Sequence, residues 1–201
     1  MRFKYSLSLS LLCLITGLSG CSTAPTQVID GRNWSNHREQ VSQINHWSIS
    51  GKMGYRSAEQ GGSANFMWTQ NQGDYTISLS GPLAMGRVVI TGNQRVAEMQ
   101  HGKNSYLQTP DQLAIQLTGM PLPVQLLSWW ATGLPSPEHL SPDNLVLNSD
   151  GTASNFEQHG WQLVFSRYQF FDQGYLPTKI IGQKDEQSFK LIIKNWSFPE
   201  N

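Results

Sequence analysis

The sequence is poor in charged residues. Of its 201 residues 14% are charged, and 14 Lys and Arg side chains balance 14 Asp and Glu side chains, so the formal net charge at pH 7 is zero. An average soluble domain carries about 25% charged residues, and a nucleic-acid-binding domain gathers basic ones into a patch. The composition therefore excludes nucleic acid as a partner.

Cysteine is almost absent. Cys13 and Cys21 are the two thiols, and both lie near the start of the chain, so the remainder can form neither a disulfide nor a cysteine-based metal site. The histidines have none of the spacings of metal ligands, and we expect them at the surface or at strand edges. They are His37, His46, His101, His139 and His159. We therefore expect no metal and no cofactor.

Catalytic motifs are missing as well. The sequence has no Gly-x-Ser-x-Gly turn of the kind that carries a hydrolase serine. Neither Gly51-Lys52 nor Gly102-Lys103 follows the glycine that a phosphate-binding loop needs. The acidic residues are spread singly, apart from Asp185-Glu186, which we place in a hairpin turn. We therefore expect that the protein is not an enzyme.

The apolar stretch over residues 6–16 is too short to cross a bilayer. It follows the basic residues Arg2 and Lys4 and has the length of the apolar region of a secretory signal peptide. Leu18-Ser19-Gly20 then place small side chains directly before Cys21, a pattern that resembles the lipobox of bacterial lipoproteins. That resemblance implies that Cys21 is lipidated and becomes the first residue after cleavage.

These features divide the chain into three segments. Residues 1–20 are expected to be a lipoprotein signal peptide, residues 21–32 the lipidated cysteine with a flexible tether, and residues 33–201 a single domain. The alternative is a plain signal peptide with an incidental cysteine. Ser22 stands where an Asp typically retains lipoproteins in the inner membrane, so resemblance to that sorting rule implies the periplasmic face of the outer membrane.

Turn residues and alternating apolar residues are what the sequence has in abundance, with 18 Gly and 10 Pro. A period of two is typical of half-buried strands. It predicts strands over residues 46–56, 64–69, 75–80, 86–91, 95–100, 104–108, 144–148, 154–158, 161–168, 178–183 and 187–196. Asn71-Gln72-Gly73-Asp74 is expected to be a hairpin connection.

Three segments follow the spacing of helices instead. Trp34, Val41 and Ile44 predict an amphipathic helix over residues 33–45. Two short helices are expected over residues 110–118 and 124–132, separated by prolines. The fold class is therefore α+β, mostly antiparallel β, with about eleven strands in one large sheet.

Large apolar residues at alternate strand positions are expected on one face of this sheet. They are Trp47, Ile49, Phe66, Trp68, Ile77 and Leu79. The second inserted helix adds Leu126, Trp129 and Trp130. Adjacent residues on a helix point about 100° apart, so at most one of the two tryptophans can face a cavity squarely. These residues suit either the lining of a cavity or a fully packed core, and both interpretations stay open here.

The turn between the strands at 75–80 and 86–91 is unusually apolar. Hairpin loops are mostly polar, yet this one contains Leu83 and Met85 after Gly81-Pro82. Leu83 can fold back onto the core, or it can form an exposed apolar tip that enters a membrane or a partner. Spacing alone leaves both possibilities open.

Several motifs resemble one known family. They are LTGMPLP at 117–123, LLSWWATGLP at 126–135, GYLPTKI at 174–180 and the Asn195-Trp196 pair. With them, the chain resembles the LolB family of outer-membrane lipoproteins over essentially all of the segment after the signal. The resemblance implies an unclosed (half) β-barrel whose short helices form a lid over an apolar cavity.

The same resemblance implies a function and partners. The chain would be an outer-membrane-anchored acceptor that receives lipoproteins from the periplasmic carrier LolA, holds their acyl chains and inserts them into the outer membrane. We expect it to be a monomer. The alternative is a structural or assembly lipoprotein of the cell envelope whose curved sheet binds protein partners.

The resemblance also assigns a membrane-insertion loop. A functional leucine of the family falls on Leu83, within the segment Pro82, Leu83, Ala84 and Met85. The local sequence departs from the family, which more often has Asn-Pro-Leu-Gly where this chain has Gly81-Pro82-Leu83-Ala84. The shape of this loop is therefore left open.

Overall fold

Alternating burial along the strands builds one large antiparallel sheet. The computed structural model describes residues 31–81, 86–137 and 141–199. Within them, eleven strands pair in the order β6-β5-β4-β3-β2-β1-β13-β12-β9-β8-β7. Their bounds are β1 His46–Arg56, β2 Gly61–Asn71, β3 Asp74–Gly81, β4 Gly86–Gly92, β5 Ala97–His101, β6 Asn104–Gln108, β7 Asp143–Leu147, β8 Ala153–Gln158, β9 Trp161–Ser166, β12 Lys179–Lys184 and β13 Gln187–Ser197.

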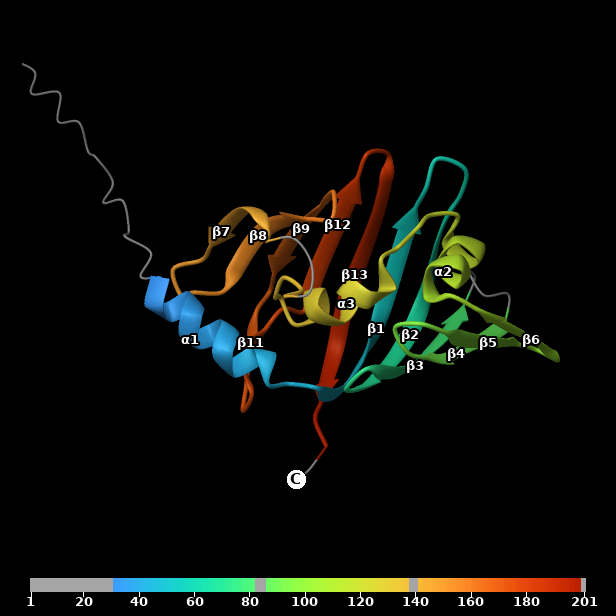
Figure 1. Cartoon of the computed structure of the whole chain (residues 1–201), viewed down its shortest axis with the longest axis horizontal. Coiled ribbons are helices and arrows are strands. Elements are labelled where there is room, and N and C mark those ends of the chain that lie inside the picture. The colour runs from blue at the N-terminus through green and yellow to red at the C-terminus, as the bar shows by residue number, and fades with distance from the viewer. Residues whose placement is uncertain (1–30, 82–85, 138–140, 200–201) are drawn as a thin grey trace, which may run out of the picture.

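The sheet is open, because its edge strands β6 and β7 do not pair with each other. Figure 1 shows β1 and β13 at its centre and the outer strands turning away on both sides. A β-bulge between Ser50 and Gly51 interrupts the β1–β13 register, and bulges increase strand bending and twist. A side chain at Gly51 would collide with the carbonyl of Ile192, so the close approach there requires glycine. The expected fold class and unclosed sheet are confirmed.

A two-stranded sheet was not predicted. It pairs β10 (Gln169–Phe171) with β11 (Gly174–Leu176), where the expected strand over 161–168 already ends at Ser166. Three residues are too few to display a period of two, and Phe170-Phe171 breaks the alternation. This hairpin lies beside α1.

The three helices of the described residues are α1 (Gly31–Ser42), α2 (Pro110–Thr118) and α3 (Val124–Ala131). α1 starts two residues before the expected start of the helix and stops three residues before its expected end. The Thr109 side chain and Gln112 form a capping box at the start of α2, and Gly119 ends that helix with a φ of 70°. None of the described helices has the length and apolar composition to span a membrane.

The main core lies between one face of the sheet and the helices α2 and α3, which lie in front of it in Figure 1. A smaller cluster of Val41, Leu134 and Leu176 attaches α1 to the end of α3 and to β11. His37 is buried against this region with 7% exposure, which corrects the expectation that the histidines lie at the surface. Its ring packs near Trp34, with 6.1 Å between ring centroids.

Candidate functional site

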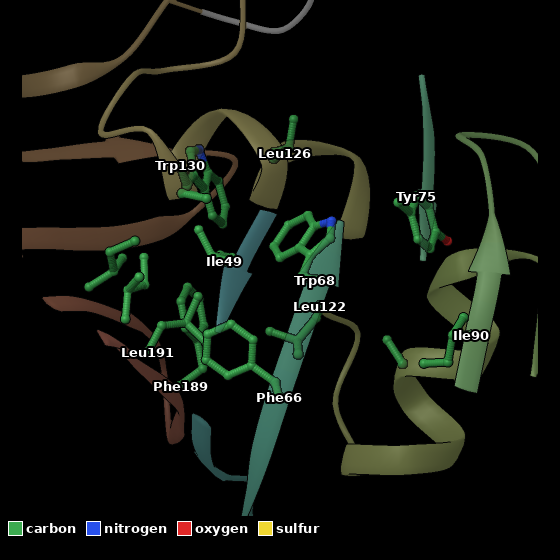
Figure 2. Close-up of a cluster of buried hydrophobic side chains, with 14 of the residues drawn as sticks. Ile49, Phe66, Trp68, Tyr75, Ile90, Leu122, Leu126, Trp130, Phe189 and Leu191 are labelled. Carbon is green, nitrogen blue, oxygen red and sulfur yellow. The ribbon is translucent and has the colours of Figure 1, made fainter. Parts of the chain in front are cut away.

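An apolar cavity of about 100 Å³ lies between the sheet and the two short helices. The sheet contributes side chains from β1 to β4 and from β13. They are Met53, Phe66, Trp68, Ile77, Leu79 and Ile90, together with Tyr75 and Leu191. In Figure 2, Phe66 and Trp68 lie on one strand near the centre, and Tyr75 and Ile90 lie farther along the sheet. Four of the residues predicted from the sequence therefore line this cavity: Phe66, Trp68, Ile77 and Leu79.

The helices α2 and α3 cover the cavity, and we call this pair the lid. The lid residues over the cavity include Leu113, Ala114, Leu117, Val124 and Leu127, and Leu122 joins them from the connection between the two helices. Among the described residues, the side-chain hydrogen bonds of α2 stay within the helix and the residues next to its ends, so no side-chain hydrogen bond joins α2 to the strands. α3 is held more firmly. Its Gln125 donates to the carbonyl of Gln94 at 2.8 Å, and its Trp130 donates to Gln158 at 3.0 Å.

Three of the predicted residues lie in the packed core and do not line the cavity. Ile49, Leu126 and Trp130 are each at most 2% exposed. The Trp130 ring stacks on Phe189 with 6.4 Å between centroids and 6° between planes. At these positions the packed-core interpretation of the sequence is the one that the structure shows.

The remaining two, Trp47 and Trp129, line a second cavity of about 260 Å³ that adjoins the first. We call it the polar cleft, because amide and hydroxyl side chains surround it. Its walls come from the end of α1, the β2–β3 turn, the β4–β5 loop and α3. Neither of the adjacent tryptophans of α3 lines the apolar cavity: Trp130 points into the core and Trp129 into the polar cleft.

Tyr75 lines both cavities. Burial raises the pKa of its phenol to about 12, and the carboxylate of Asp111 adds to the effect. The hydroxyl is therefore protonated at neutral pH and can act as a hydrogen-bond donor. Its hydroxyl makes no hydrogen bond to another described residue.

The sequence analysis did not select several residues that line the apolar cavity. Met53, Tyr75, Ile90 and Leu191 each lie at an alternating position of a strand, so the same period-two signal could have found them. Leu113 and Leu117 share one face of α2 at a spacing of four, the corresponding signal for a helix.

The predicted lipidation and insertion sites, Cys21 and residues 82–85, lie outside the described residues. The strands on either side of the loop pair up to Gly81 and Gly86, which face each other. These two glycines have φ values of 115° and 141°, a backbone conformation that L side chains rarely adopt. The loop is therefore a four-residue connection between glycines.

A family model described as "Outer membrane lipoprotein LolB" matches residues 45–196. This range includes ten complete strands of the large sheet, all of β13 except its last residue, and the whole lid. The chain belongs to the LolB family. The outer-membrane lipoprotein LolB of Pseudomonas paraeruginosa is 34% identical over 200 residues and covers 98% of this chain and 97% of the relative. That of Stutzerimonas stutzeri is 33% identical over 191 residues, with 92% of each chain covered.

Solved structures share the fold at low sequence identity. A LolA superfamily protein from Nitrosomonas europaea superposes with a TM-score of 0.54 at 9% identity, covering 84% of this chain and 94% of that one. A DUF1329 family protein from Desulfovibrio piger has the same TM-score at 8% identity, with 84% and 91% covered. The chain thus shares its fold with a LolA superfamily protein. The LolB family is one of lipoprotein receptors and not of enzymes.

Proposed function

We propose that this protein is the outer-membrane receptor that takes lipoproteins from the carrier LolA, holds their acyl chains between sheet and lid, and passes them to the outer membrane. The observation that carries the proposal is the apolar cavity beneath α2 and α3 in a chain of the LolB family. We also propose that the protein acts as a monomer.

Hydrophobic burial provides the binding energy. Each buried methylene group of an acyl chain contributes about 0.8 kcal/mol, so a whole chain contributes on the order of 10 kcal/mol. The sequence contains no phosphate-binding loop that would couple transfer to nucleotide hydrolysis. Transfer therefore runs down a gradient of affinity, from carrier to receptor to bilayer.

The lid must move to admit a chain. The cavity of about 100 Å³ is smaller than the about 150 Å³ of apolar space that takes up one benzene molecule. α2 is the part of the lid that can move first, because its contacts to the strands are apolar and an acyl chain can replace them one for one. α3 stays attached through Trp130 and Gln158.

Two further elements belong to this proposal. Lipidation of Cys21 anchors the protein at the target membrane, and residues 82–85 carry Leu83 into the bilayer when the client is released. Support comes from the lipobox-like sequence and from the two glycines that frame a short apolar loop at the end of β3 and β4.

A substitution within the lid tests the function. Leu117→Trp puts a larger ring into the cavity, so we expect client transfer from LolA to fall at least tenfold. Ile115→Trp is the matched control, because Ile115 lies on the same helix, is 47% exposed and does not line the cavity. The measurement is the amount of a radiolabelled lipoprotein that moves from the carrier to each variant.

The two competing functions give different results. Equal transfer to both variants would mean that the cavity holds no acyl chain. An envelope protein that binds protein partners through its sheet would accept no client from the carrier in either variant or in the wild type, and this outcome would overturn the proposal.

A further inference from the structure

The polar cleft contains no charged side chain, although it is open to solvent. Its polar groups are amides and hydroxyls, among them Asn45, Gln72, Asn93 and Ser128. Its walls also include two indole rings and one phenol, from Trp47, Trp129 and Tyr75. The apolar side chains at its walls are Val41, Ile44, Pro110 and Val124. A site of this kind offers hydrogen bonds to neutral groups and nothing to compensate an ionic charge.

The polar cleft and the apolar cavity are neighbours in the fold. They share Tyr75, Pro110 and Val124 as lining residues. Trp68 also connects them, because its ring lines the apolar cavity and its Nε1 donates to the Oε1 of Gln70 in the polar cleft at 3.0 Å. Two adjacent residues of α3 line different cavities: Leu127 lines the apolar cavity and Ser128 lines the polar cleft.

Three residues that line the polar cleft have side-chain donors without a partner in the described part of the chain. Within the described residues, Nε1 of Trp47, Nε1 of Trp129 and the hydroxyl of Tyr75 make no hydrogen bond to the protein. None of these atoms is fully enclosed, since the one buried unpaired side-chain atom of the described residues belongs to His37. The three groups can therefore donate to a ligand that brings neutral acceptors, and the raised pKa of Tyr75 keeps its proton in place.

We propose that the polar cleft binds the uncharged junction between the acyl chains and the peptide of a client lipoprotein. In that junction, ester and amide carbonyls join the chains to a modified N-terminal cysteine and to the first peptide bonds. N-acylation removes the terminal positive charge, so the ligand is neutral, rich in acceptors and attached directly to hydrocarbon. The three properties match an uncharged, donor-bearing cleft next to an apolar cavity, and the assignment rests on the proposed function.

The test uses the pair of neighbours on α3. A photo-crosslinking amino acid is placed at Leu127, at Ser128 or at Met67, which is 60% exposed on the outer face of β2. The full chain is reconstituted in phosphatidylethanolamine–phosphatidylglycerol vesicles and irradiated with a synthetic triacylated cysteinyl pentapeptide. Mass spectrometry then locates the labelled atoms of this lipopeptide.

We expect the Leu127 position to label acyl carbons, the Ser128 position to label the glyceryl-cysteine or peptide residues, and the Met67 position to label neither. Two outcomes would overturn the inference and leave the proposed function intact. In the first, Leu127 labels acyl carbons and Ser128 labels nothing. In the second, both positions label acyl carbons. No labelling at Leu127 would overturn both the inference and the proposed function. Crosslinking at Ser128 that a neutral oligosaccharide suppresses, and that excess lipopeptide without a label does not suppress, would show that the cleft binds sugar instead.

A donor deletion gives an independent measurement. Tyr75→Phe removes one hydroxyl and keeps the ring that lines both cavities, so we expect lipopeptide affinity to fall about threefold to tenfold. Tyr55→Phe is the control, because Tyr55 is half-buried on β1 and lines neither cavity. Equal affinity in the two variants would show that Tyr75 donates nothing to the ligand.

Discussion

Gln158 connects β8 to α3 and to the segment that follows α3. It is 3% exposed, and its Oε1 accepts from Trp130 Nε1 and from the backbone N–H of Ser136, each at 3.0 Å. Its Nε2 donates to the carbonyl of Ser136 at 2.9 Å. A buried donor or acceptor that loses its partner costs about 1–3 kcal/mol. This side chain therefore holds the end of α3 and the segment after it against β8.

We expect Gln158→Leu to lower the free energy of unfolding by about 2–4 kcal/mol, because three buried polar groups lose their partner at once. Urea denaturation followed by tryptophan fluorescence measures the difference. Gln162→Leu, on the exposed side of β9, should stay within about 0.5 kcal/mol of the wild type. Similar losses in the two variants would contradict this account of Gln158.

His37 should make stability depend on pH. Burial lowers its pKa from 6.5, the Asp150 carboxylate opposes that effect, and its Nε2 has no hydrogen-bond partner among the described residues. Because the native state binds the proton less readily than the unfolded state, the contribution of His37 is complete above pH 6.5 and declines as the pH falls toward the lower native pKa.

We therefore expect the wild type to lose stability between pH 7.5 and pH 5.5, and His37→Phe to lose less. Urea denaturation at both pH values measures the two slopes. His101→Phe replaces an exposed histidine and should keep the wild-type slope. A His37→Phe slope equal to that of the wild type would show that another group titrates.

At the scale of elements, the two adjacent tryptophans of α3 show what the sequence can and cannot predict. Helical spacing states that they point about 100° apart, and the structure agrees. Helical spacing does not state what each tryptophan contacts. In the structure Trp130 lies in the core and Trp129 lines the polar cleft, while Leu127 lines the apolar cavity. A cavity lining and a packed core both require apolar residues at the same positions, so only their placement in space separates Ile77 from Ile49.

Gly133 ends α3 in a position that only glycine suits. Its φ is 82°, and a Cβ there would lie 2.7 Å from the hydroxyl of Tyr168, which is itself held at 2.8 Å by the carbonyl of Ala153. Gly102 has a similar φ of 62° but open space around it. We expect Gly133→Ala to reduce stability by about 1–3 kcal/mol more than Gly102→Ala, because only the former also forces a half-buried, hydrogen-bonded tyrosine to move. Thermal and urea unfolding of both variants test this, and equal losses would contradict it.

The loop at 82–85 should act in release rather than in acceptance. Leu83→Glu leaves the cavity unchanged, so we expect clients to move from carrier to receptor at the normal rate. Delivery to liposomes should fail, because an acidic residue in hydrocarbon costs a few kcal/mol, on the order of 3 kcal/mol at the bilayer centre. A two-step transfer assay separates the stages.

Leu107→Glu is the matched control for this loop, since Leu107 is 72% exposed on the edge strand β6. It should deliver clients normally. A large drop in the melting temperature of Leu83→Glu would identify Leu83 as a core residue, and normal delivery would remove the loop from the mechanism.

At the scale of the whole molecule, alternation and turn residues along the chain were sufficient to predict all eleven strands of the large sheet, because nine of them bury residues, mostly at alternate positions, and only the edge strands β6 and β7 bury none. The polar cleft could not be predicted in this way. Most of its residues come from the end of α1, two turns of the sheet and α3, which are distant in the sequence and lie together only in the folded protein. Amides at such positions look like ordinary loop residues in the sequence.

The anchor should determine where the protein acts and not what it binds. The described walls of the apolar cavity lie between Met53 and Leu191, well beyond Cys21. We therefore expect Cys21→Ala to abolish membrane attachment, which a lipid anchor supports with about 0.8 kcal/mol per buried methylene group, while client acceptance from the carrier stays within twofold. Cys13→Ala, in the expected signal peptide, should change neither property. Membrane fractionation and the carrier-to-receptor assay measure the two effects separately. A Cys21→Ala protein that folds, as judged by its unfolding curve, yet accepts no client would mean that the anchor is part of the binding site.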